Sequence, residues 1–444
     1  MQYTMGLHVA TTEHEGVKMK ASSLLLWNVL SVLVLLHLSG TALTAQKFEI
    51  PPTLPAQTLV PASLLSGDGF RVQQQVPTDG LMAHFTIQSD VGTFQANSIE
   101  MLKIRVGEIP AIMQLNKTSK SKVFAQSVAR NAVRPVQAAG QMVMHPVDTV
   151  TGLPSGVGRF FGRVGLAGQK LKQAATEPEE APASEKAGQF ATTAGQATRN
   201  LFGYEEERRH LAKQLHVDPY TTNPVLSKQL DDFALTAFRA HVGVTTTIGI
   251  LVPGSMAITA TRVVSTWVWD KPKADLIVQN QKTLQQLLVP DRVIKAFMGN
   301  PVFPLSVQTE FVSNLKLLSG IPGTGEAVTL ASTAESEEQA RFLTDAVGML
   351  VRYNDTQTPI TRLIVRKAII GRDRNGAIVV QAPVDYVSWT ALVSTFAHRS
   401  DFAGSRRTIW LTGQLSPMSR ENFRTLGWTV NEKVNPIPDV DESR

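Results

Sequence analysis

Residues 360–382 read ITRLIVRKAIIGRDRNGAIVVQA and decide how the C-terminal part of the chain folds. Two runs rich in Ile and Val, ITRLIVRKAII (360–370) and AIVVQA (377–382), have the composition of β-strands. GRDRNG lies between them, and its Asn375-Gly376 pair is a strong signal for a tight hairpin turn. The stretch therefore predicts two strands joined by a hairpin.

Further helices and strands are expected on both sides of this hairpin. AVTLAS (327–332) has the composition of a strand, and Ser332 with Glu335 forms a capping box for the helix that follows. We predict a mixed α/β domain over 300–434, followed by a disordered tail over 435–444. The other elements expected in this domain are helices over 335–354 and 386–398, a helix from Ser416-Pro417 to Gly427, and strands over 407–413 and 428–434.

Residues 46–115 have a different pattern, in which short runs alternate apolar and polar side chains. Turn signals such as PTDG (77–80) separate these runs, which is typical of β-hairpins. A helix-like run follows, and Gly107 with Pro110 is expected to end it near Val106. We predict a β-rich N-terminal subdomain over 46–115.

Residues 116–299 have mostly helical spacing. The stretch ATEPEEAPASEKAGQ (175–189) within them is rich in Pro, Glu, Ala and Ser, and we predict that it is a mobile linker. Asn223 and Pro224 are the residue types expected at the N-cap and the first position of a helix. The predicted fold class is therefore α+β, with a β-rich N-terminal subdomain, a helical middle and a mixed α/β C-terminal domain.

The composition of the chain excludes several kinds of chemistry. The 444 residues include no cysteine, so disulfides, thiolate zinc sites, iron–sulfur clusters and cysteine nucleophiles are ruled out. The net charge of +6 is mildly basic and fits anionic surfaces in general. No cluster of Lys and Arg is dense enough for nucleic-acid binding, so we expect no nucleic-acid partner. We also expect no metal ion and no other cofactor.

The first 45 residues predict export from the cytoplasm. Residues 19–45 read MKASSLLLWNVLSVLVLLHLSGTALTA, with Lys20 before an apolar run and small residues at its end. This is the order of a cleaved export signal, and the apolar run is short for a membrane span. We take Met19 as the true start of an export signal within 1–45 and expect a periplasmic or secreted protein. An uncleaved N-terminal anchor is the alternative.

The stretch SGIPGTGEAV (319–328) has the glycine spacing of a phosphate-binding loop. Such a loop continues with a Lys that reaches the phosphates and a hydroxyl that binds Mg²⁺, but here Glu326 and Ala327 occupy those positions. A phosphate-binding loop normally follows a strand and precedes a helix. Here the run before the loop has helical spacing and a strand is predicted after it, so the order of the elements is reversed. We therefore expect no nucleotide partner.

A glycine-rich stretch over 153–172 predicts a loose cationic helix. Such a helix can lie on an anionic membrane surface, and an ordinary helix with a solvated basic face is the other interpretation. The apolar segment 243–269 is interrupted by Pro253-Gly254, so we expect a buried helix or helical hairpin there and no membrane span. The membrane-surface candidates in the cationic helix are Arg159, Phe160, Arg163, Val164 and Lys170.

HVDPYTTNPVL (216–226) is the most distinctive loop of the chain. One interpretation is a rigid connection between two helices, in which the Asp-Pro step makes a turn and the Asn caps the next helix. The other is a loop that binds a partner or ligand through Asp218, Tyr220 and Thr221. No G-x-S-x-G elbow and no H-E-x-x-H helix occurs in the chain, so we nominate no catalytic and no metal-binding residue.

Three stretches, together with the export signal, carry a resemblance to known proteins. They are HPVDTVTGLPSGVGRFF (145–161), VDPYTTNPVL (217–226) and IWLTGQLSPMSRENFRTLGWTV (409–430). In these stretches the chain resembles a group of uncharacterised exported bacterial proteins. The resemblance implies a location in the bacterial envelope, and it carries over no catalytic residue.

These observations favour a non-enzymatic protein of the Gram-negative envelope, or a secreted one, that binds a protein or an envelope surface. A membrane-active protein that uses 153–172 and 243–269 on an anionic membrane is one alternative. A hydrolase of an envelope polymer, with catalytic residues scattered along the chain, is another. The sequence leaves open whether the protein has an enzymatic activity.

Overall fold

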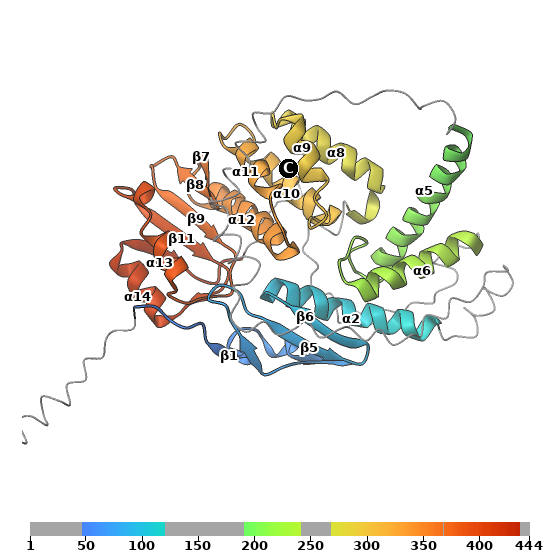
Figure 1. Cartoon of the computed structure of the whole chain (residues 1–444), viewed down its shortest axis with the longest axis horizontal. Coiled ribbons are helices and arrows are strands. Elements are labelled where there is room, and N and C mark those ends of the chain that lie inside the picture. Colours follow the sequence, from blue (N-terminus) through green and yellow to red (C-terminus); the bar gives the residue numbers. More distant parts are fainter. Residues whose placement is uncertain (1–46, 120–190, 241–267, 367, 436–444) are drawn as a thin grey trace, which may run out of the picture. The chain divides into compact units, whose positions relative to one another are not determined.

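The structure is a computed structural model, shown in Figure 1, in which a β-rich N-terminal region, a helical middle and a mixed α/β C-terminal region follow one another. This arrangement confirms the predicted α+β fold class. From Ile50 onward the described residues form one compact unit. None of the described helices is both long and apolar enough to cross a membrane. The residues that the structure describes are 47–119, 191–240, 268–366 and 368–435.

Several sequence predictions lie outside the described residues. They are the export signal over 1–45, the cationic helix over 153–172, the linker over 175–189, nearly all of the apolar segment 243–269, and the tail over 435–444 apart from its first residue.

The N-terminal region is a small antiparallel sheet against which one long helix packs. Helix α2 (Ile99–Ser119) buries Ile112 and Leu115 in the same core as Phe85 and Ile87 of the sheet. The sheet has the order β2-β3-β5-β6, and a separate antiparallel pair joins β1 to β4. The strands are β1 (Thr53–Pro55), β2 (Ser66–Gly67), β3 (Phe70–Val72), β4 (Gln75–Pro77), β5 (Phe85–Ser89) and β6 (Gly92–Ala96).

Helix α2 continues through the two residues that were expected to end it, so that prediction was wrong. Gly107 and Pro110 lie in the middle of the helix. Proline in a helix interior removes one backbone hydrogen bond and costs about 3 kcal/mol. Ile109, Ile112 and Leu115, which follow the predicted end, are fully buried. Burial of each large apolar side chain contributes roughly 1.5–3 kcal/mol, so packing outweighs the local penalty.

The described part of the middle region is helical, as predicted. Helix α6 begins where the sequence placed it, because the side chain of Asn223 accepts hydrogen bonds from the backbone N–H groups of Val225 and Leu226. The helices described here are α5 (Ala191–Gln214), α6 (Pro224–Ala240), α8 (Lys273–Gln286) and α9 (Asp291–Met298).

The C-terminal region is built on a five-stranded sheet with the order β13-β11-β9-β8-β7. Helix α12 lies on one face of this sheet, while α13 and α14 lie on the other (Figure 1). Strands β9, β11 and β13 are parallel, so their carboxyl ends lie at the same edge. The helices are α10 (Leu305–Leu317), α11 (Thr324–Ala331), α12 (Glu337–Thr356), α13 (Ala391–Ala397) and α14 (Pro417–Thr425). The sheet strands are β7 (Ile360–Val365), β8 (Ile369–Asp373), β9 (Ile378–Ala382), β11 (Arg407–Leu411) and β13 (Trp428–Asn431), and β10 (Tyr386–Val387) pairs with β12 (Gln414–Leu415).

The run 360–370 contains two strands where the sequence predicted one. Strands β7 and β8 are antiparallel and meet at the pair Val365 and Ile369, so the chain turns back at the residues between them. The hairpin predicted at Asn375-Gly376 is confirmed, because β8 and β9 are antiparallel and Gly376 has a φ of 77°. The first turn was missed because it contains no glycine, proline or asparagine.

The strand expected over 327–332 is wrong, because these residues belong to helix α11 and its C-cap. Short apolar runs suit a buried strand and a buried helix equally, so their composition does not separate the two. The capping box is also displaced by four residues. Ser336, rather than Ser332, accepts a hydrogen bond from the N–H of Gln339, whose side chain accepts one from the N–H of Glu335.

The helix predicted over 386–398 is shorter than expected. Residues 386–387 form β10, and α13 begins only after Thr390, whose hydroxyl accepts a hydrogen bond from the N–H of Val393. The predicted strands over 407–413 and from Trp428 are confirmed. The helix from Ser416 to Gly427 is also confirmed, with Ser416 as its N-cap.

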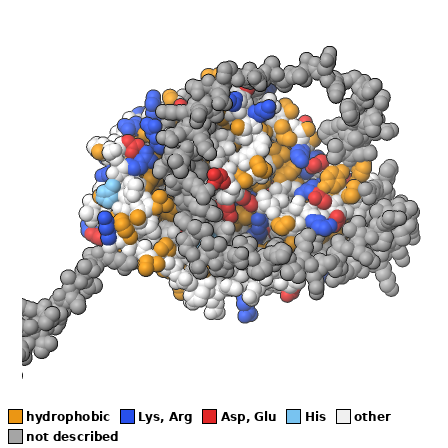
Figure 2. Space-filling model, viewed as in Figure 1, with side chains coloured by type: hydrophobic (Ala, Val, Ile, Leu, Met, Phe, Trp, Pro, Cys, Tyr) orange, Lys and Arg blue, Asp and Glu red, His pale blue; other side chains and the backbone are white. Residues whose placement is uncertain are grey.

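Strand β7 forms one edge of the sheet, and its surroundings are basic. Figure 2 shows Lys and Arg side chains gathered over this part of the molecule. Arg362 and Arg366 are exposed on or next to β7, and Arg374 is exposed after β8. Charged side chains at an open strand edge discourage pairing with another chain, so this patch protects the edge.

Candidate functional site

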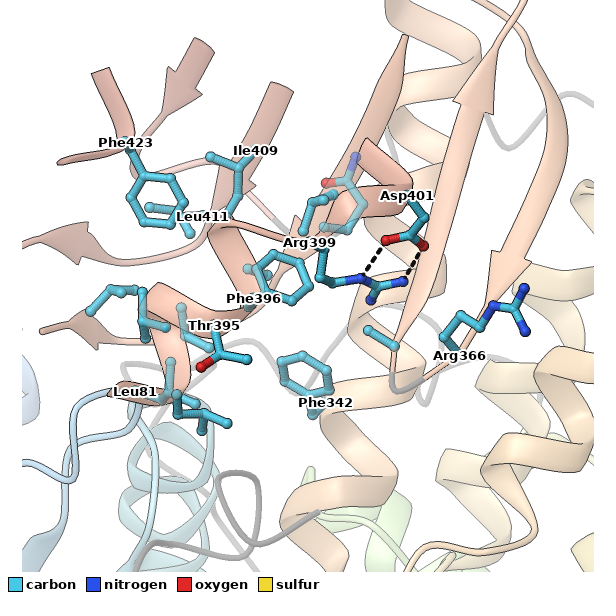
Figure 3. A pocket seen from close by; sticks show the side chains of 18 of the residues that line it. Leu81, Phe342, Arg366, Thr395, Phe396, Arg399, Asp401, Ile409, Leu411 and Phe423 are labelled. Carbon is cyan, nitrogen blue, oxygen red and sulfur yellow. Dashed lines mark hydrogen bonds and ion pairs between the residues drawn. The ribbon is translucent and has the colours of Figure 1, made fainter. Parts of the chain in front are cut away.

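A cavity lies between α13 and one face of the C-terminal sheet. Val380 and Ala382 of β9 are paired with Ile409 and Leu411 of β11, so these four side chains lie on the same face. Phe396 of α13 lines the same cavity and lies near Ile409 and Leu411 (Figure 3). The cavity has a volume of about 720 Å³, which is within the range of small-molecule pockets. Its other apolar lining residues are Leu81, Phe342, Val365, Ala368, Val384, Val387, Leu392, Val393 and Phe423.

Gln381 also lines this cavity, although it leaves the sheet on the opposite face. It alternates with Val380 and Ala382 along β9 and is paired with Trp410, which contacts Tyr353 of α12. Strand β9 is hydrogen-bonded on both sides, to β8 and to β11. The amide of Gln381 is therefore buried on the opposite side of the strand, while the carboxyl end of β9 borders the cavity. In open α/β sheets, this is the edge at which ligands usually bind.

The side chain of Gln381 is buried but has unused hydrogen-bonding capacity. Only 2% of the residue is exposed, and neither its amide nitrogen nor its amide oxygen has a hydrogen-bond partner among the described residues. A buried polar group without a partner costs roughly 1–3 kcal/mol. Both amide atoms are fully buried, so neither is exposed to the cavity.

The mouth of the cavity carries an ion pair. The guanidinium of Arg399 donates hydrogen bonds of 2.9 and 2.6 Å to the two carboxylate oxygens of Asp401, and it lies 4.4 Å from the ring centre of Phe402. These hydrogen bonds lower the pKa of Asp401. Arg366 also lines the mouth, but its guanidinium points away from Phe396 and Phe342 (Figure 3). The charges of Arg399 and Asp401 thus neutralise one another.

The cavity is suited to binding and is poorly suited to catalysis. Apart from Gln381 and the charges at the mouth, the polar side chain in its lining is Thr395, whose hydroxyl donates to the carbonyl of Ala391 over 2.7 Å. A catalytic site needs a nucleophile or an acid–base group within reach of the substrate. The lining offers mostly apolar surface instead.

The binding residues nominated from the sequence lie elsewhere, in the loop between α5 and α6. The carboxylate of Asp218 accepts a hydrogen bond of 2.8 Å from the N–H of Tyr220 and another from the hydroxyl of Ser306. Burial raises the pKa of Asp218 against these hydrogen bonds. Thr221 donates a hydrogen bond to the carboxylate of Glu108. Each of these groups therefore serves the packing of the loop against α2 and α10.

Tyr220 differs from its neighbours in this loop. Its hydroxyl is buried without a hydrogen-bond partner among the described residues. Burial and the charge of Glu205 raise the pKa of Tyr220, so the hydroxyl stays protonated at neutral pH. The structure thus brings Asp218, Tyr220 and Thr221 together in one loop, but it does not bring them to the cavity.

An ionic network connects this loop to α2 and α12. Arg105 donates hydrogen bonds to Glu108 over 3.0 Å and to Thr222 over 2.8 Å, and Thr222 donates to Glu337 over 2.5 Å. Burial opposes ionisation of Glu337, yet the charge of Arg341 and the hydrogen bond of Thr222 hold its pKa below the ordinary value. These contacts join helices that are far apart in the sequence.

Three carboxyl groups from different helices meet near Arg341, and we call them the carboxyl cluster: Glu100, Glu310 and Asp345. Burial, followed by the charge of Glu100, raises the pKa of Glu310 to about 7. Burial and then the charge and hydrogen bond of Glu100 raise the pKa of Asp345 well above its ordinary value. Among the described residues, no group of three or more acidic or His side chains is placed to hold a metal ion.

The sequence analysis missed Gln381. The available signal was a single amide within the otherwise apolar strand IVVQA, at a position that alternation places among buried side chains. The five membrane-surface candidates of the cationic helix lie outside the described residues.

Comparison with known proteins adds no family assignment. No family model matches the chain, and no curated protein and no solved structure matches it significantly.

Proposed function

We propose that the protein is a non-enzymatic binding protein of the bacterial envelope that holds a small, largely apolar molecule in the cavity between α13 and the sheet. The observation that supports this proposal is the cavity of about 720 Å³ with its apolar lining. The envelope location rests on the export signal in residues 19–45. The partner of this protein is then a small molecule or an envelope component that carries one.

The cavity is open to a test with a fluorescent apolar probe. The neutral probe phenylnaphthylamine should bind the purified chain saturably and with one-to-one stoichiometry. Ala382→Phe places a ring inside the cavity and should abolish binding. Ala391→Phe adds the same ring to an exposed position of α13 outside the lining, so its binding should be unchanged.

Two results would count against the proposal. Failure of the natural chain to bind any apolar probe contradicts the proposed function. Equal loss of binding in both variants, with unchanged thermal unfolding, contradicts the location. A second copy of the chain is another occupant to test. Sedimentation should be measured with and without the probe, and a dimer that dissociates when the probe binds would assign the cavity to that second copy.

A hydrolase of an envelope polymer is a second candidate, favoured by the carboxyl cluster. A carboxyl group with a raised pKa can donate a proton to a leaving group near neutral pH. Glu310, with a pKa of about 7, would be the acid. Incubation with purified envelope polysaccharide tests this candidate: the natural chain should release soluble fragments and Glu310→Gln should not. No release by the natural chain would sink the idea.

A membrane-active protein remains a prediction from the sequence alone. Segment 153–172 lies outside the described residues, and so does nearly all of segment 243–269. Flotation with anionic vesicles tests it. Binding that is lost when Arg159, Arg163 and Lys170 are changed to Gln would support a membrane role.

A further inference from the structure

Two arginines lie directly opposite each other at one side of the C-terminal sheet. Arg362 of β7 and Arg372 of β8 are partners in the antiparallel register, and we call them the arginine pair. The side chains of such partners leave the sheet on the same face, with their Cβ atoms about 4.5–5.5 Å apart. Two like charges in this position destabilise a sheet. Folding alone therefore does not account for the arginine pair.

The acid of this hairpin does not neutralise the arginine pair. Residues 357–382 contain a single acid, Asp373, which alternates with Arg372 along β8 and so leaves the sheet on the opposite face. Its carboxylate accepts hydrogen bonds from the hydroxyl of Tyr353 and from two N–H groups of the following turn. Neither guanidinium of the arginine pair forms a hydrogen bond or an ion pair with a residue that the structure describes. Arg374, which is exposed, adds a third positive charge beside them.

A third arginine in the same cross-strand row is used by the fold. Arg407 of β11 lies two strands away from Arg372, on the same face. Its guanidinium donates a hydrogen bond to the carbonyl of Leu426 and lies 5.5 Å from the ring centre of Trp428. By contrast, Arg362 is exposed and Arg372 is half-buried, and both guanidinium groups are free to bind an anion.

Protection of the sheet edge does not explain the arginine pair. The N–H of Leu363 in β7 donates to the carbonyl of Pro322 over 2.8 Å, so a loop already covers the middle of this edge. One charged side chain on β7, such as Arg362, also discourages pairing with another chain. Arg372, however, lies on β8, which is hydrogen-bonded to strands on both sides and is not an edge strand. Its position opposite Arg362 therefore calls for another role.

The chemistry of the arginine pair fits a phosphomonoester. A guanidinium donates two parallel hydrogen bonds to an oxyanion such as phosphate. A phosphomonoester carries a charge of about −1.5 to −2 at pH 7, so one such group can neutralise both arginines. A carboxylate or a sulfate ester has a single negative charge and would leave one arginine without compensation.

The surroundings of the arginine pair favour a ligand in solution over a membrane lipid. A surface that binds a bilayer usually combines cations with exposed apolar side chains that insert into it. The described part of the β7–β8 hairpin offers no exposed large apolar side chain. Those that are exposed among the described residues lie in other parts of the chain: Ile50, Ile277, Val278, Leu288 and Leu317.

We propose that Arg362 and Arg372, with Arg374 beside them, form a binding site for a water-soluble phosphomonoester. The site lies beside the amino end of β9, because Arg372 is paired with Ile378. The cavity borders the carboxyl end of the same strand. The two sites are therefore separate, and the phosphate site does not depend on the proposed function.

Glucose 6-phosphate and glucose 6-sulfate test the choice of ligand, because they are similar in shape and differ in charge. In calorimetric titrations at about pH 8 and low salt, the phosphate should bind about tenfold more tightly than the sulfate, since one additional charge-assisted hydrogen bond contributes roughly this factor. Equal affinities, or no binding of the phosphate, would overturn the inference. Tighter binding to vesicles that contain phosphatidic acid would overturn it as well, because the ligand would then be a membrane lipid.

Arg362→Gln and Arg372→Gln should each reduce the affinity for glucose 6-phosphate about tenfold. Arg424→Gln is the matched control, because it removes the same charge from an exposed arginine whose guanidinium is already hydrogen-bonded to Glu421. The affinity of this control should be unchanged. An equal loss in all three variants would mean that the ligand responds only to net charge, and it would contradict the site.

The stability of the variants separates a binding role from a structural one. Arg372→Gln removes the repulsion within the arginine pair, so it should raise the melting temperature by roughly 1–2 °C at low salt. About 1 M NaCl should abolish this gain, because the screening length is then about 3 Å. A lower melting temperature would show that Arg372 supports the fold, and it would overturn the inference. Phenylnaphthylamine should bind these variants as it binds the natural chain, and its failure to bind any of them would affect the proposed function only.

Discussion

The carboxylate of Asp385 accepts a hydrogen bond of 3.0 Å from the backbone N–H of Ala83, which lies 302 positions earlier in the chain. The same oxygen accepts a hydrogen bond of 3.1 Å from the N–H of Ile99, the first residue of α2. A negative charge at a helix N-terminus is favourable. One buried side chain thus joins the segment after β9 to both parts of the N-terminal region, beside Val384 and Val387 of the cavity lining.

Removal of this carboxylate should destabilise the protein severely. Asp385→Ala leaves two buried N–H groups without partners, and each costs roughly 1–3 kcal/mol. We expect the free energy of unfolding to fall by roughly 2–4 kcal/mol in urea titrations. Asp385→Asn keeps an oxygen that can accept both hydrogen bonds, so it should cost much less. Equal losses in the two variants would show that the hydrogen bonds do not matter.

Stability should decrease as the pH rises from about 5 to about 8. Burial raises the pKa of Asp385 to about 7, and burial with the charge of Glu100 raises the pKa of Glu310 to about 7. In the unfolded chain both groups lose their protons near pH 4, so between pH 4 and 7 the folded state binds more protons. The stabilisation is complete below pH 4 and is lost as the pH passes 7.

The size of this effect can be assigned to individual groups. Two carboxyl groups with shifts of this kind should together change the free energy of unfolding by on the order of 5 kcal/mol between pH 5 and pH 8. Glu310→Gln and Asp385→Asn should each reduce the change in the free energy of unfolding with pH, as measured by urea titrations at several pH values. A profile that rises over this interval in the natural chain would contradict the assignment of both groups.

The elements that the sequence predicted correctly carry strong local signals. Asn223 before Pro224 and Ser416 before Pro417 mark helix starts, and Asn375-Gly376 marks a turn, because the chemistry of those few residues is sufficient to set the backbone. The prediction of the end of α2 failed because burial of side chains determines where this helix ends. Helix α2 passes Pro110 because the side chains beyond it are buried, and no local signal reports that burial.

The cavity could not be predicted from the sequence, for a related reason. Gln381 follows three apolar residues on β9, but Phe396, Phe342 and Leu81, which enclose the same cavity, come from distant parts of the chain. A pocket formed by long-range contacts has no local pattern. The orphaned amide becomes evident only when its neighbours in space are known.

The glycines of SGIPGTGEAV should differ sharply in their tolerance of a side chain. Gly323 has a φ of 105°, and a Cβ there would lie 2.3 Å from the carbonyl oxygen of Leu363. The carbonyl of Pro322 accepts a hydrogen bond of 2.8 Å from the N–H of Leu363, so the loop is held close to β7. The glycine spacing thus reflects packing of this loop against the sheet.

Gly323→Ala should therefore destabilise the protein by roughly 2 kcal/mol or more, because both the backbone conformation and the space oppose a side chain. A Cβ at Gly325 meets nothing within 4 Å, and this residue lies in α11. Gly325→Ala should be neutral or stabilise by up to about 1 kcal/mol. Thermal unfolding of the two variants measures the contrast, and similar melting temperatures would refute the packing explanation.

Gln381→Met should make the ligand-free protein more stable, by roughly 1–3 kcal/mol, because it replaces a buried amide without a partner by an apolar side chain of similar length. Asn280 provides the comparison. It is also 2% exposed, but its amide donates a hydrogen bond of 3.0 Å to the hydroxyl of Thr309. Asn280→Leu should therefore destabilise the protein by about 1 kcal/mol or more. Urea titrations should give opposite signs for the two substitutions, because only the amide of Asn280 has a partner. Loss of stability in Gln381→Met would mean that the amide is satisfied within the protein.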